Sequence, residues 1–232
     1  MDHATVFFLT QTLADIPADL RWLSAGERAR VAAFRFPKRR NDWLLGRWTA
    51  KRTLLAFLIH AGQVAPEYPS LDIRSAPDGA PEAFLHDLPA PLSLGLSHSG
   101  GRALCAVAPA GLSLGCDLEA VQPRDASLVE DYFRDEEKAL VLRAPFEEQP
   151  LMATLIWSAK ESALKCLREG LRRDTRSVSV AIADERRPRW NSLTVSCLES
   201  SRVFYGWWRG NGGYVLTVAA GRPIHEPVAL LV

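Results

Sequence analysis

The sequence lacks the features typical of secreted, membrane-spanning or metal-clustered proteins. It has only four cysteines, which lie far apart and form no CxxC pair: Cys105, Cys116, Cys166 and Cys197. We therefore predict free thiols in a reducing cytoplasm, with neither a zinc site nor a disulfide framework. The longest apolar runs, such as Leu54–Ile59, fall far short of the roughly 20 residues that a membrane span needs. The apolar stretch near the N-terminus is also too short for a signal peptide.

An excess of charge is missing as well. Lys and Arg total 28 and Asp and Glu total 27 among 232 residues, so the net charge is +1, and bulk charge does not indicate nucleic acid or a membrane surface. P-loop and GxGxxG motifs are absent, which excludes a glycine cradle for a nucleotide. Without a GxSxG motif, a Ser-His-Asp hydrolase is also disfavoured. The composition, 47% hydrophobic, is that of a globular protein with one large core or two small ones.

One segment departs from this balance. Nine residues between Arg28 and Arg52 are basic and one, Asp42, is acidic, which gives a local charge of +8 in 25 residues. Apolar residues recur at helical spacing from Asn41 to His60, so we predict an amphipathic helix capped by Asn41. A cationic helix with Trp and Phe is compatible with a nucleic-acid or membrane-surface element, and equally with a solvated face.

The order of the predicted elements indicates the fold class. After the basic helix come strands near 70–75, 92–96, 103–108 and 113–118, then helices over 127–142 and 151–169, and strands at 177–182, 192–198, 203–208 and 214–219. This order predicts an α+β fold of two similar halves, each a small, largely antiparallel sheet packed with a long helix. We assign the halves to 1–112 and 113–232, with the ligand groove between them. No residue-level repeat is evident between them.

The first candidate motif is Gly115-Cys116-Asp117-Leu118-Glu119. Side chains alternate along a strand, so Asp117 and Glu119 share one face about 6.5–7 Å apart, while Leu114, Cys116 and Leu118 face the core. Two repelling carboxylates on one face suit a hard divalent cation. An isolated DxE is more often an exposed strand edge.

The second motif runs from Trp157 to Lys165 (Trp-Ser-Ala-Lys-Glu-Ser-Ala-Leu-Lys). Trp157, Glu161 and Lys165 follow at helical spacing opposite an apolar stripe. A Glu-Lys pair four residues apart is a common feature of solvated helix surfaces. A tryptophan at the head of that row instead implies a second layer of structure, which would leave Glu161 and Lys165 lining a cleft.

The third motif is the predicted tight turn Ser97-His98-Ser99-Gly100-Gly101. Small residues, hydroxyls and an imidazole in a turn suit an oxyanion such as phosphate. A single histidine in a turn is otherwise most often structural.

Taken together, these motifs resemble the 4′-phosphopantetheinyl transferases of the surfactin-synthetase-activating type. The family pattern GxDxE, followed some forty residues later by WxxKExxxK, stands here as 115–119 and 157–165. Leu96–Gly100 is similar to the family's SHS turn, and Arg30 with Leu45-Gly46-Arg47 resembles its basic N-terminal segment. The motifs match in order over residues 27–165.

The resemblance implies a pseudo-dimer of two α/β halves with coenzyme A bound between them. It implies transfer of the phosphopantetheine arm to a serine of an apo acyl or peptidyl carrier protein, with release of 3′,5′-ADP. By position, Asp117, Glu119 and Glu161 would hold Mg²⁺. Asp117, Glu161 and Lys165 would be catalytic, with Glu161 or a water it orients taking the serine proton. The coenzyme-binding residues would be Arg30, Arg47, Gly79, Pro81, Ser97, His98, Lys160 and Lys165.

Two positions depart from the family pattern. Where Gly-Lys-Pro is frequent, this chain has Gly79-Ala80-Pro81, so a phosphate-contacting lysine is missing. A second basic residue expected one turn before Arg30 is Glu27. Phosphate binding is therefore expected to depend more on Arg28, Arg40 or Arg47.

Other function classes remain open at this stage. The alternatives are a non-catalytic module that binds carrier proteins or nucleic acid through the basic helix, and a Mg²⁺-dependent phosphohydrolase. The three carboxylates with Lys165 argue against a binding module, which needs none of them. We expect a cytoplasmic monomer whose partners are coenzyme A and a carrier protein, with no nucleic acid and no membrane.

Overall fold

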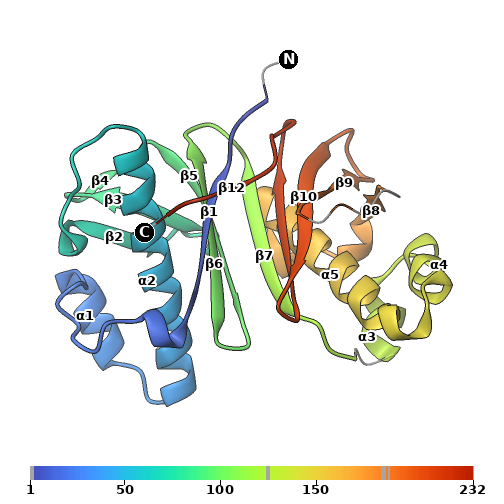
Figure 1. Cartoon of the computed structure of the whole chain (residues 1–232), viewed down its shortest axis with the longest axis horizontal. Helices are drawn as coiled ribbons and strands as arrows, with labels where there is room; N and C mark the ends of the chain where they lie inside the picture. The colour runs from blue at the N-terminus through green and yellow to red at the C-terminus, as the bar shows by residue number, and fades with distance from the viewer. Residues whose placement is uncertain (1–2, 124–125, 184–186, 188, 232) are drawn as a thin grey trace.

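Two largely antiparallel sheets lie side by side in the molecule, and each packs against one long helix (Figure 1). The computed structural model describes residues 3–123, 126–183, 187 and 189–231. The first sheet has the strand order β12-β1-β6-β5, the second β7-β11-β10-β9-β8, and a small third sheet β2-β3-β4. The predicted α+β fold is confirmed. Among the described helices, none combines the length and the apolar character needed to cross a bilayer.

The strands follow the alternation of their side chains. The first sheet contains β1 (Phe7–Thr12), β5 (Leu92–Ser99), β6 (Arg102–Pro109) and β12 (Val228–Ala229). The second contains β7 (Leu114–Ala120), β8 (Val178–Ile182), β9 (Asn191–Cys197), β10 (Val203–Asn211) and β11 (Tyr214–Ala220). The small sheet contains β2 (Leu71–Ser75), β3 (Pro81–Leu85) and β4 (Leu88–Pro89).

Five α-helices and five short 3-10 helices complete the described chain. The α-helices are α1 (Ala25–Ala32), α2 (Pro37–His60), α3 (Ala126–Tyr132), α4 (Asp135–Arg143) and α5 (Gln149–Cys166). The 3-10 helices are Leu13–Asp15, Tyr68–Ser70, Phe146–Glu148, Gly170–Arg172 and Thr175–Ser177.

Several element boundaries differ from the prediction. The basic helix begins at Pro37 and not at Asn41, because proline at the first helical position has no N–H to leave unpaired. The helix predicted over 127–142 is two helices, α3 and α4. They are separated at Phe133, whose side chain is buried in the hydrophobic cluster between α5 and the second sheet. Ser97-His98-Ser99 belongs to β5, and the turn is made by Gly100 and Gly101, both with positive φ.

The two halves repeat the same path. Each starts with a strand (β1 or β7), continues into a long helix (α2 or α5), and ends with a strand that pairs antiparallel with the first (β6 or β11). The chain passes from one half to the other between β6 and β7. The last segment departs from this plan, because β12 returns to pair parallel with β1. Residues 228–229, assigned to the second half on sequence, therefore complete the first sheet.

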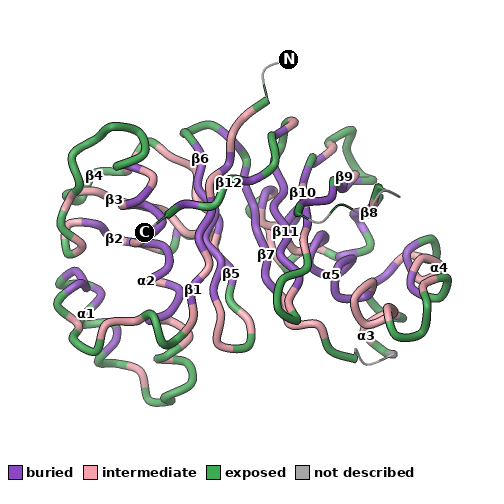
Figure 2. The backbone as a smooth tube through the Cα atoms, in the orientation of Figure 1, coloured by how far each residue is buried: buried purple, intermediate pink, exposed green. Residues whose placement is uncertain are grey.

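The buried residues of the central strands and long helices form the core (Figure 2). The core side of β7 is as predicted, since Leu114, Cys116 and Leu118 all lie in the cluster between the two sheets. Trp157 is 8% exposed, and its ring packs in a T-shaped arrangement with that of Tyr132 from α3, with 5.5 Å between the ring centroids. The second layer that the tryptophan implied is therefore present.

A short residue-level repeat exists after all. Trp48-Thr49-Ala50-Lys51 of α2 matches Trp157-Ser158-Ala159-Lys160 of α5. The two tetrapeptides occupy corresponding helices of the two halves. The sequence expectation of no such repeat was wrong, because a four-residue match becomes significant only once the helices that carry it are known to be equivalent.

Candidate active site

The site forms where the edge of the first sheet meets the edge of the second. Strand β5 lies along β7, and the side chains of the two edges interlock: Ser97 Oγ donates to Asp117 Oδ1 at 2.7 Å, and Ser99 Oγ donates to Glu119 Oε2 at 3.2 Å. The edges approach this closely because Gly95 has no side chain. A Cβ at that position would lie 3.2 Å from the Cys116 nitrogen and sulfur.

A second glycine brings the helix α5 onto the same strand. A Cβ on Gly115 would lie 2.1 Å from the Ser162 carbonyl oxygen and 2.9 Å from the Cys166 nitrogen, so the helix backbone rests directly on β7. Thr217, the β11 partner of Asp117, fixes the helix from the other side through Ser158 and Ser162, at 2.9 and 2.6 Å between hydroxyl oxygens. The glycine of GxDxE is therefore required for packing.

These contacts bring the two motifs together around Lys165. Its ammonium nitrogen lies 2.7 Å from Asp117 Oδ1 and 3.4 Å from Glu161 Oε2. It also donates to the Cys116 carbonyl oxygen and to Ser97 Oγ, at 3.1 and 3.3 Å. Asp117 is only 1% exposed, which is far from the exposed strand edge that an isolated DxE most often represents.

The electrostatics of this cluster are strongly coupled. Burial, reinforced by the nearby carboxylates of Asp117 and Glu119, raises the pKa of Glu161, and Lys165 only partly offsets this. Burial alone would lower the pKa of Lys165, but Asp117 and Glu161 outweigh it and the pKa is raised. The site therefore holds one persistent cation among three carboxylates.

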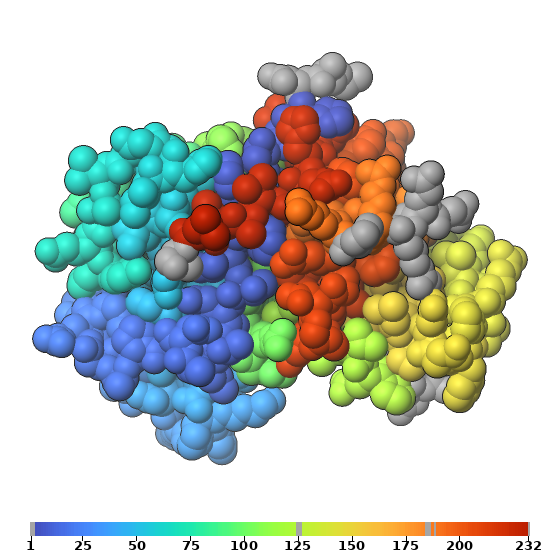
Figure 3. Space-filling view, viewed as in Figure 1, coloured from blue at the N-terminus to red at the C-terminus, as the bar shows by residue number. Residues whose placement is uncertain are grey.

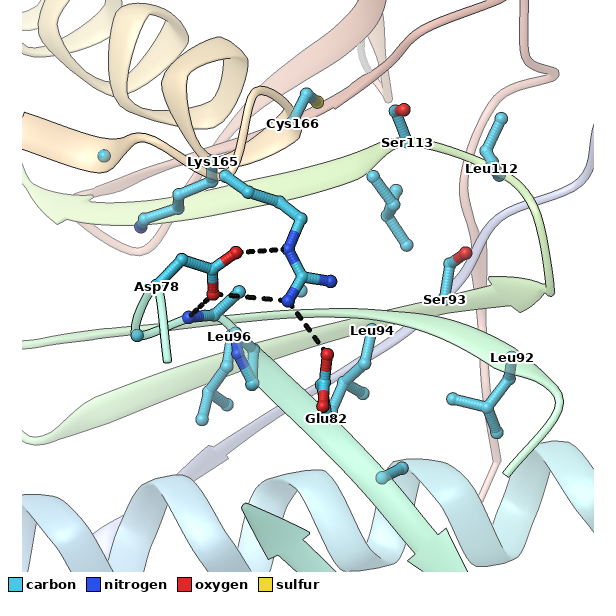
Figure 4. Close-up of a pocket in the computed structure, with 18 of the residues that line it drawn as sticks. Asp78, Glu82, Leu92, Ser93, Leu94, Leu96, Leu112, Ser113, Lys165 and Cys166 are labelled. Carbon is cyan, nitrogen blue, oxygen red and sulfur yellow. Dashed lines mark hydrogen bonds and ion pairs between the residues drawn. The ribbon is translucent and has the colours of Figure 1, made fainter. Parts of the chain in front are cut away.

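A cavity of about 1140 Å³ adjoins the cluster. Its wall is largely apolar and includes Leu92, Leu94, Leu96 and Leu112, while Lys165 lies at its edge (Figure 4). Gly79 and Pro81, both predicted to bind the coenzyme, also line it. The cavity is thus bounded by the two edge strands, the start of β3 and the C-terminal end of α5.

An ionic bridge spans this cavity from one half to the other. Arg168, just after α5, pairs with Asp78 at 2.6 Å and with Glu82 at 2.8 Å. Figure 4 shows these two carboxylates with dashed lines to their partner. Arg172 donates to the Asp78 carbonyl oxygen at 2.6 Å. Sequence reasoning did not assign these residues to the site, and it included Ser99 in the third motif without giving it a role of its own. The alternation of β5 would have indicated Ser99, but nothing local connects residues 78 and 168.

Lys160 requires a correction. It was predicted to bind the coenzyme, but its side chain is fully buried and its ammonium lies 2.7 Å from Glu137 on α4. The ammonium also donates to the Thr175 and Val178 carbonyl oxygens. A lysine whose donors are used inside the core cannot reach a ligand in the groove.

The remaining predicted residues lie apart from the acidic cluster. His98 is exposed and, because side chains alternate along β5, lies on the face opposite Ser97. Arg30, on α1, stacks over Phe34, and Arg47, on α2, lies 5.0 Å from the centre of the Trp43 ring. Burial lowers the pKa of Arg47. Glu27 is buried beside Lys51, which explains why no surface cation stands at that position.

The residues present fit a divalent cation in their chemistry. Within the described part of the chain, no group of three His, Cys, Asp or Glu side chains forms a ready-made metal cage. However, Asp117 Oδ2 is buried and has no hydrogen-bond partner, and Glu161 lies close enough to interact electrostatically with both Asp117 and Glu119. Mg²⁺ commonly binds one or two carboxylates together with substrate phosphates, so a complete protein cage is not needed.

Comparisons with known proteins agree with the motifs. The family model described as the 4′-phosphopantetheinyl transferase superfamily matches residues 113–219. The 4′-phosphopantetheinyl transferase HetI of Nostoc sp. is 28% identical over 204 residues, 80% of this chain and 80% of that protein. The 4′-phosphopantetheinyl transferase Sfp of Bacillus subtilis is 26% identical over 208 residues, 88% of this chain and 89% of that protein.

A solved structure was also matched. A holo-(acyl-carrier-protein) synthase from Bacillus anthracis, in complex with CoA (3′,5′-ADP), has a TM-score of 0.38 at 18% identity and covers 47% of this chain and 97% of that chain. The family match covers β7 and α5, which hold Asp117, Glu119, Glu161 and Lys165, and the two relatives align with most of the chain. Residues 113–219 are therefore similar to the 4′-phosphopantetheinyl transferase superfamily, and most of the chain is similar to two proteins named as 4′-phosphopantetheinyl transferases.

Proposed function

We propose that this protein transfers the 4′-phosphopantetheine group of coenzyme A to a serine hydroxyl of an apo acyl or peptidyl carrier protein, with Mg²⁺ and with release of 3′,5′-ADP. The observation that supports this best is the cluster of the buried Asp117 with the half-buried Lys165 and Glu161, beside the large cavity between the halves. A cation and several carboxylates at one end of an apolar cavity suit a ligand with a phosphate group and a long arm.

Each residue of the cluster would have a distinct task. Lys165, already held by Asp117, would neutralise the negative charge that develops on the leaving 3′,5′-ADP. This charge develops as the bond between the transferred phosphorus and the bridging oxygen of the pyrophosphate breaks. Glu161 would accept the proton of the attacking serine, directly or through a water, and its raised pKa brings it closer to the range of an effective base. Phosphoryl transfer depends mainly on positioning and charge neutralisation, which this rigid cluster supplies.

Asp117, Glu161 and Glu119 would hold the metal. Asp117 offers the buried oxygen that has no other partner, and Glu119 is held in place by Ser99. When bound, Mg²⁺ would neutralise charge on the coenzyme pyrophosphate. The protein residues would provide its orientation and would exclude water from the buried side of the site.

The rest of the coenzyme would lie in the cavity and along the basic first half. Gly79 and Pro81 line the cavity, Ser97 contacts the cluster, and Arg30, Arg47 and His98 would meet the phosphates. We also propose that the halves 1–112 and 113–232 act together in one cytoplasmic monomer. Each contributes one edge strand to the site, so a second chain is not required.

The test is one incubation of the protein with coenzyme A, Mg²⁺ and an apo carrier protein, followed by mass spectrometry of the carrier. Transfer adds one phosphopantetheine mass to the carrier, and the addition disappears when the carrier's serine is replaced by alanine. An unchanged carrier with release of inorganic phosphate would indicate a phosphohydrolase. An unchanged carrier that co-elutes with the protein would indicate a binding module.

A further inference from the structure

The two long helices each bury one lysine completely, and neither lysine belongs to the acidic cluster. On α5, Lys160 pairs with Glu137 at 2.7 Å, and the two side chains are 0% and 1% exposed. On α2, Lys51 pairs with Glu27 at 2.5 Å, and these side chains are 0% and 4% exposed. Two fully buried ion pairs in 232 residues are costly, because both charges lose their hydration.

The surroundings of the two pairs correspond in most of their contacts. They differ in one carbonyl that each lysine contacts, that of Trp22 for Lys51 and that of Val178 for Lys160. Each glutamate is the third residue of the short helix before the long one, α1 or α4. Each accepts a backbone N–H at the start of that helix, from Ser24 at 3.0 Å and from Arg134 at 2.9 Å.

Each glutamate also accepts the N–H of the third residue of the strand that follows the long helix. These donors are Ile73 of β2 at 3.4 Å and Val180 of β8 at 3.0 Å. Each lysine donates to a carbonyl five residues before that strand residue, of Tyr68 at 3.1 Å and of Thr175 at 2.9 Å. An aromatic ring faces each ammonium, with Trp22 at 5.8 Å and Phe133 at 6.0 Å.

The correspondence identifies the pairs as one device present twice. Each pair joins a short helix, a long helix and a strand at a single point. Replacing such a pair by apolar residues is often neutral or stabilising, so stability does not explain why both halves have it. The neighbouring residues suggest a reason: Lys160 directly precedes Glu161, and Glu27 is one turn before Arg30 on α1.

We propose that the two pairs are positioning devices with divided tasks: Lys160–Glu137 sets α5 so that Glu161 and Lys165 reach the reacting phosphate, and Lys51–Glu27 sets α1 and its Arg30 against the coenzyme. This inference rests on the proposed function. It predicts that loss of the Lys160–Glu137 pair lowers kcat and that loss of the Lys51–Glu27 pair raises the KM for coenzyme A.

The test uses two apolar double variants, Lys160→Met with Glu137→Leu and Lys51→Met with Glu27→Leu. Removing both charges avoids leaving one buried and unpaired, so both proteins are expected to fold with melting temperatures near that of the native protein. The first should lose about 100-fold in kcat, the typical cost of a small misplacement of reacting groups, with an unchanged KM for coenzyme A. The second should raise that KM about tenfold or more, the value of a lost charged contact, with an unchanged kcat.

If the pairs had only a structural role, double variants with native-like melting temperatures would also have native kcat and KM. This result would overturn the proposal. So would equal effects of the two double variants on the same parameter. If either protein fails to fold, the double variants Lys160→Gln with Glu137→Gln and Lys51→Gln with Glu27→Gln replace them. These also remove both charges but keep hydrogen-bonding groups, and we expect the same division between kcat and KM with smaller changes.

If the native protein does not modify a carrier, the proposed function fails, and the positioning proposal is judged by ligand binding instead. The melting-temperature rise with Mg²⁺ should then be lost only in the α5 double variant, and the rise with coenzyme A only in the α2 double variant. The opposite assignment, or native shifts in both, would refute it.

Discussion

Replacement of Lys165 by methionine tests whether the acidic cluster is a cation site. The side chain is 28% exposed and its ammonium contacts Asp117 and Glu161 at 2.7 and 3.4 Å. Its removal leaves Asp117 buried without its cation and leaves three carboxylates in mutual repulsion. Breaking a fully buried pair costs about 3–5 kcal/mol, and the partial exposure of Lys165 reduces this to about 1–3 kcal/mol.

Magnesium should restore much of that loss. In the native protein a metal ion must compete with the Lys165 ammonium for the Asp117 and Glu161 oxygens. In the variant this competition is absent. A ligand at 100 times its dissociation constant stabilises by about 2.7 kcal/mol. At about 2–4 °C per kcal/mol for a chain of this size, the variant should melt about 2–12 °C lower without Mg²⁺ and gain more from Mg²⁺ than the native protein does.

The assay is thermal unfolding across a Mg²⁺ titration, with Lys138→Met as the matched control. Lys138 is 21% exposed, against 28% for Lys165, and pairs with the exposed Glu130 at 2.8 Å and Asp135 at 3.8 Å. Its loss therefore removes a lysine of similar exposure that has no contact with the cluster among its described ion pairs. The control should show no added response to Mg²⁺. If Lys165→Met also gains no more from Mg²⁺ than the native protein, the carboxylates do not form a metal site. Transfer by Lys165→Met should be slower by about 100- to 1000-fold in either case, because a stabilising charge is lost.

Four further outcomes are expected. Gly115→Ala should destabilise the fold by at least about 1–3 kcal/mol in urea unfolding, because the added Cβ meets the α5 backbone at 2.1 Å. Glu161→Gln should stabilise the fold increasingly as pH rises above the ordinary glutamate pKa of about 4.3, because a raised carboxyl pKa gives stability that is present at low pH and is lost as pH rises through that pKa. Asp78→Asn should blunt the loss of stability in acid, since Arg168 lowers the pKa of Asp78 to about 2 and that contribution disappears as pH falls towards this value. Cys116, whose pKa burial raises to about 12, should react with a thiol reagent at about pH 8 only after unfolding.

Local patterns predicted those parts of the site that lie within one element. Alternation along β7 placed Asp117 opposite Cys116 and Leu118, and helical spacing placed Glu161 and Lys165 on one row. Their assembly depends on Gly95 and Gly115, whose missing side chains let three elements approach. The closeness of such approaches cannot be derived from the spacing of residues in a single strand or helix.

The residues that were misplaced depend on distant contacts. Lys160 was assigned to the coenzyme through the family resemblance, and only the packing of α4 against α5 brings Glu137 to it. The strand β1 and its parallel partner β12 join residues more than 200 positions apart, and no local signal specifies that pairing. The early start of α2 had a local signal in Pro37, but the periodicity of the apolar residues outweighed it in the prediction.

Comparison of the two halves also shows that only the second has the carboxylates of the acidic cluster. In the second half, Asp117 of β7 pairs with Thr217 of β11, whose hydroxyl contacts Ser162 of α5. In the first half, Leu9 of β1 pairs with Cys105 of β6, which contacts Thr53 of α2. Leu9 therefore occupies the position that corresponds to Asp117. By the same register, Gln11 corresponds to Glu119. The matched tetrapeptides make Arg52 and Ala56 of α2 the equivalents of Glu161 and Lys165 of α5. The first half thus keeps the buried lysine and its glutamate but has none of the four charged residues of the cluster. The first half therefore retains only the buried ion pair, whereas the second half has both the ion pair and the charged residues of the cluster. A single chain thus offers one such site, at the contact of β5 with β7. This contact joins the N-terminal half, blue to teal in Figure 3, to the C-terminal half, which includes the yellow and orange residues.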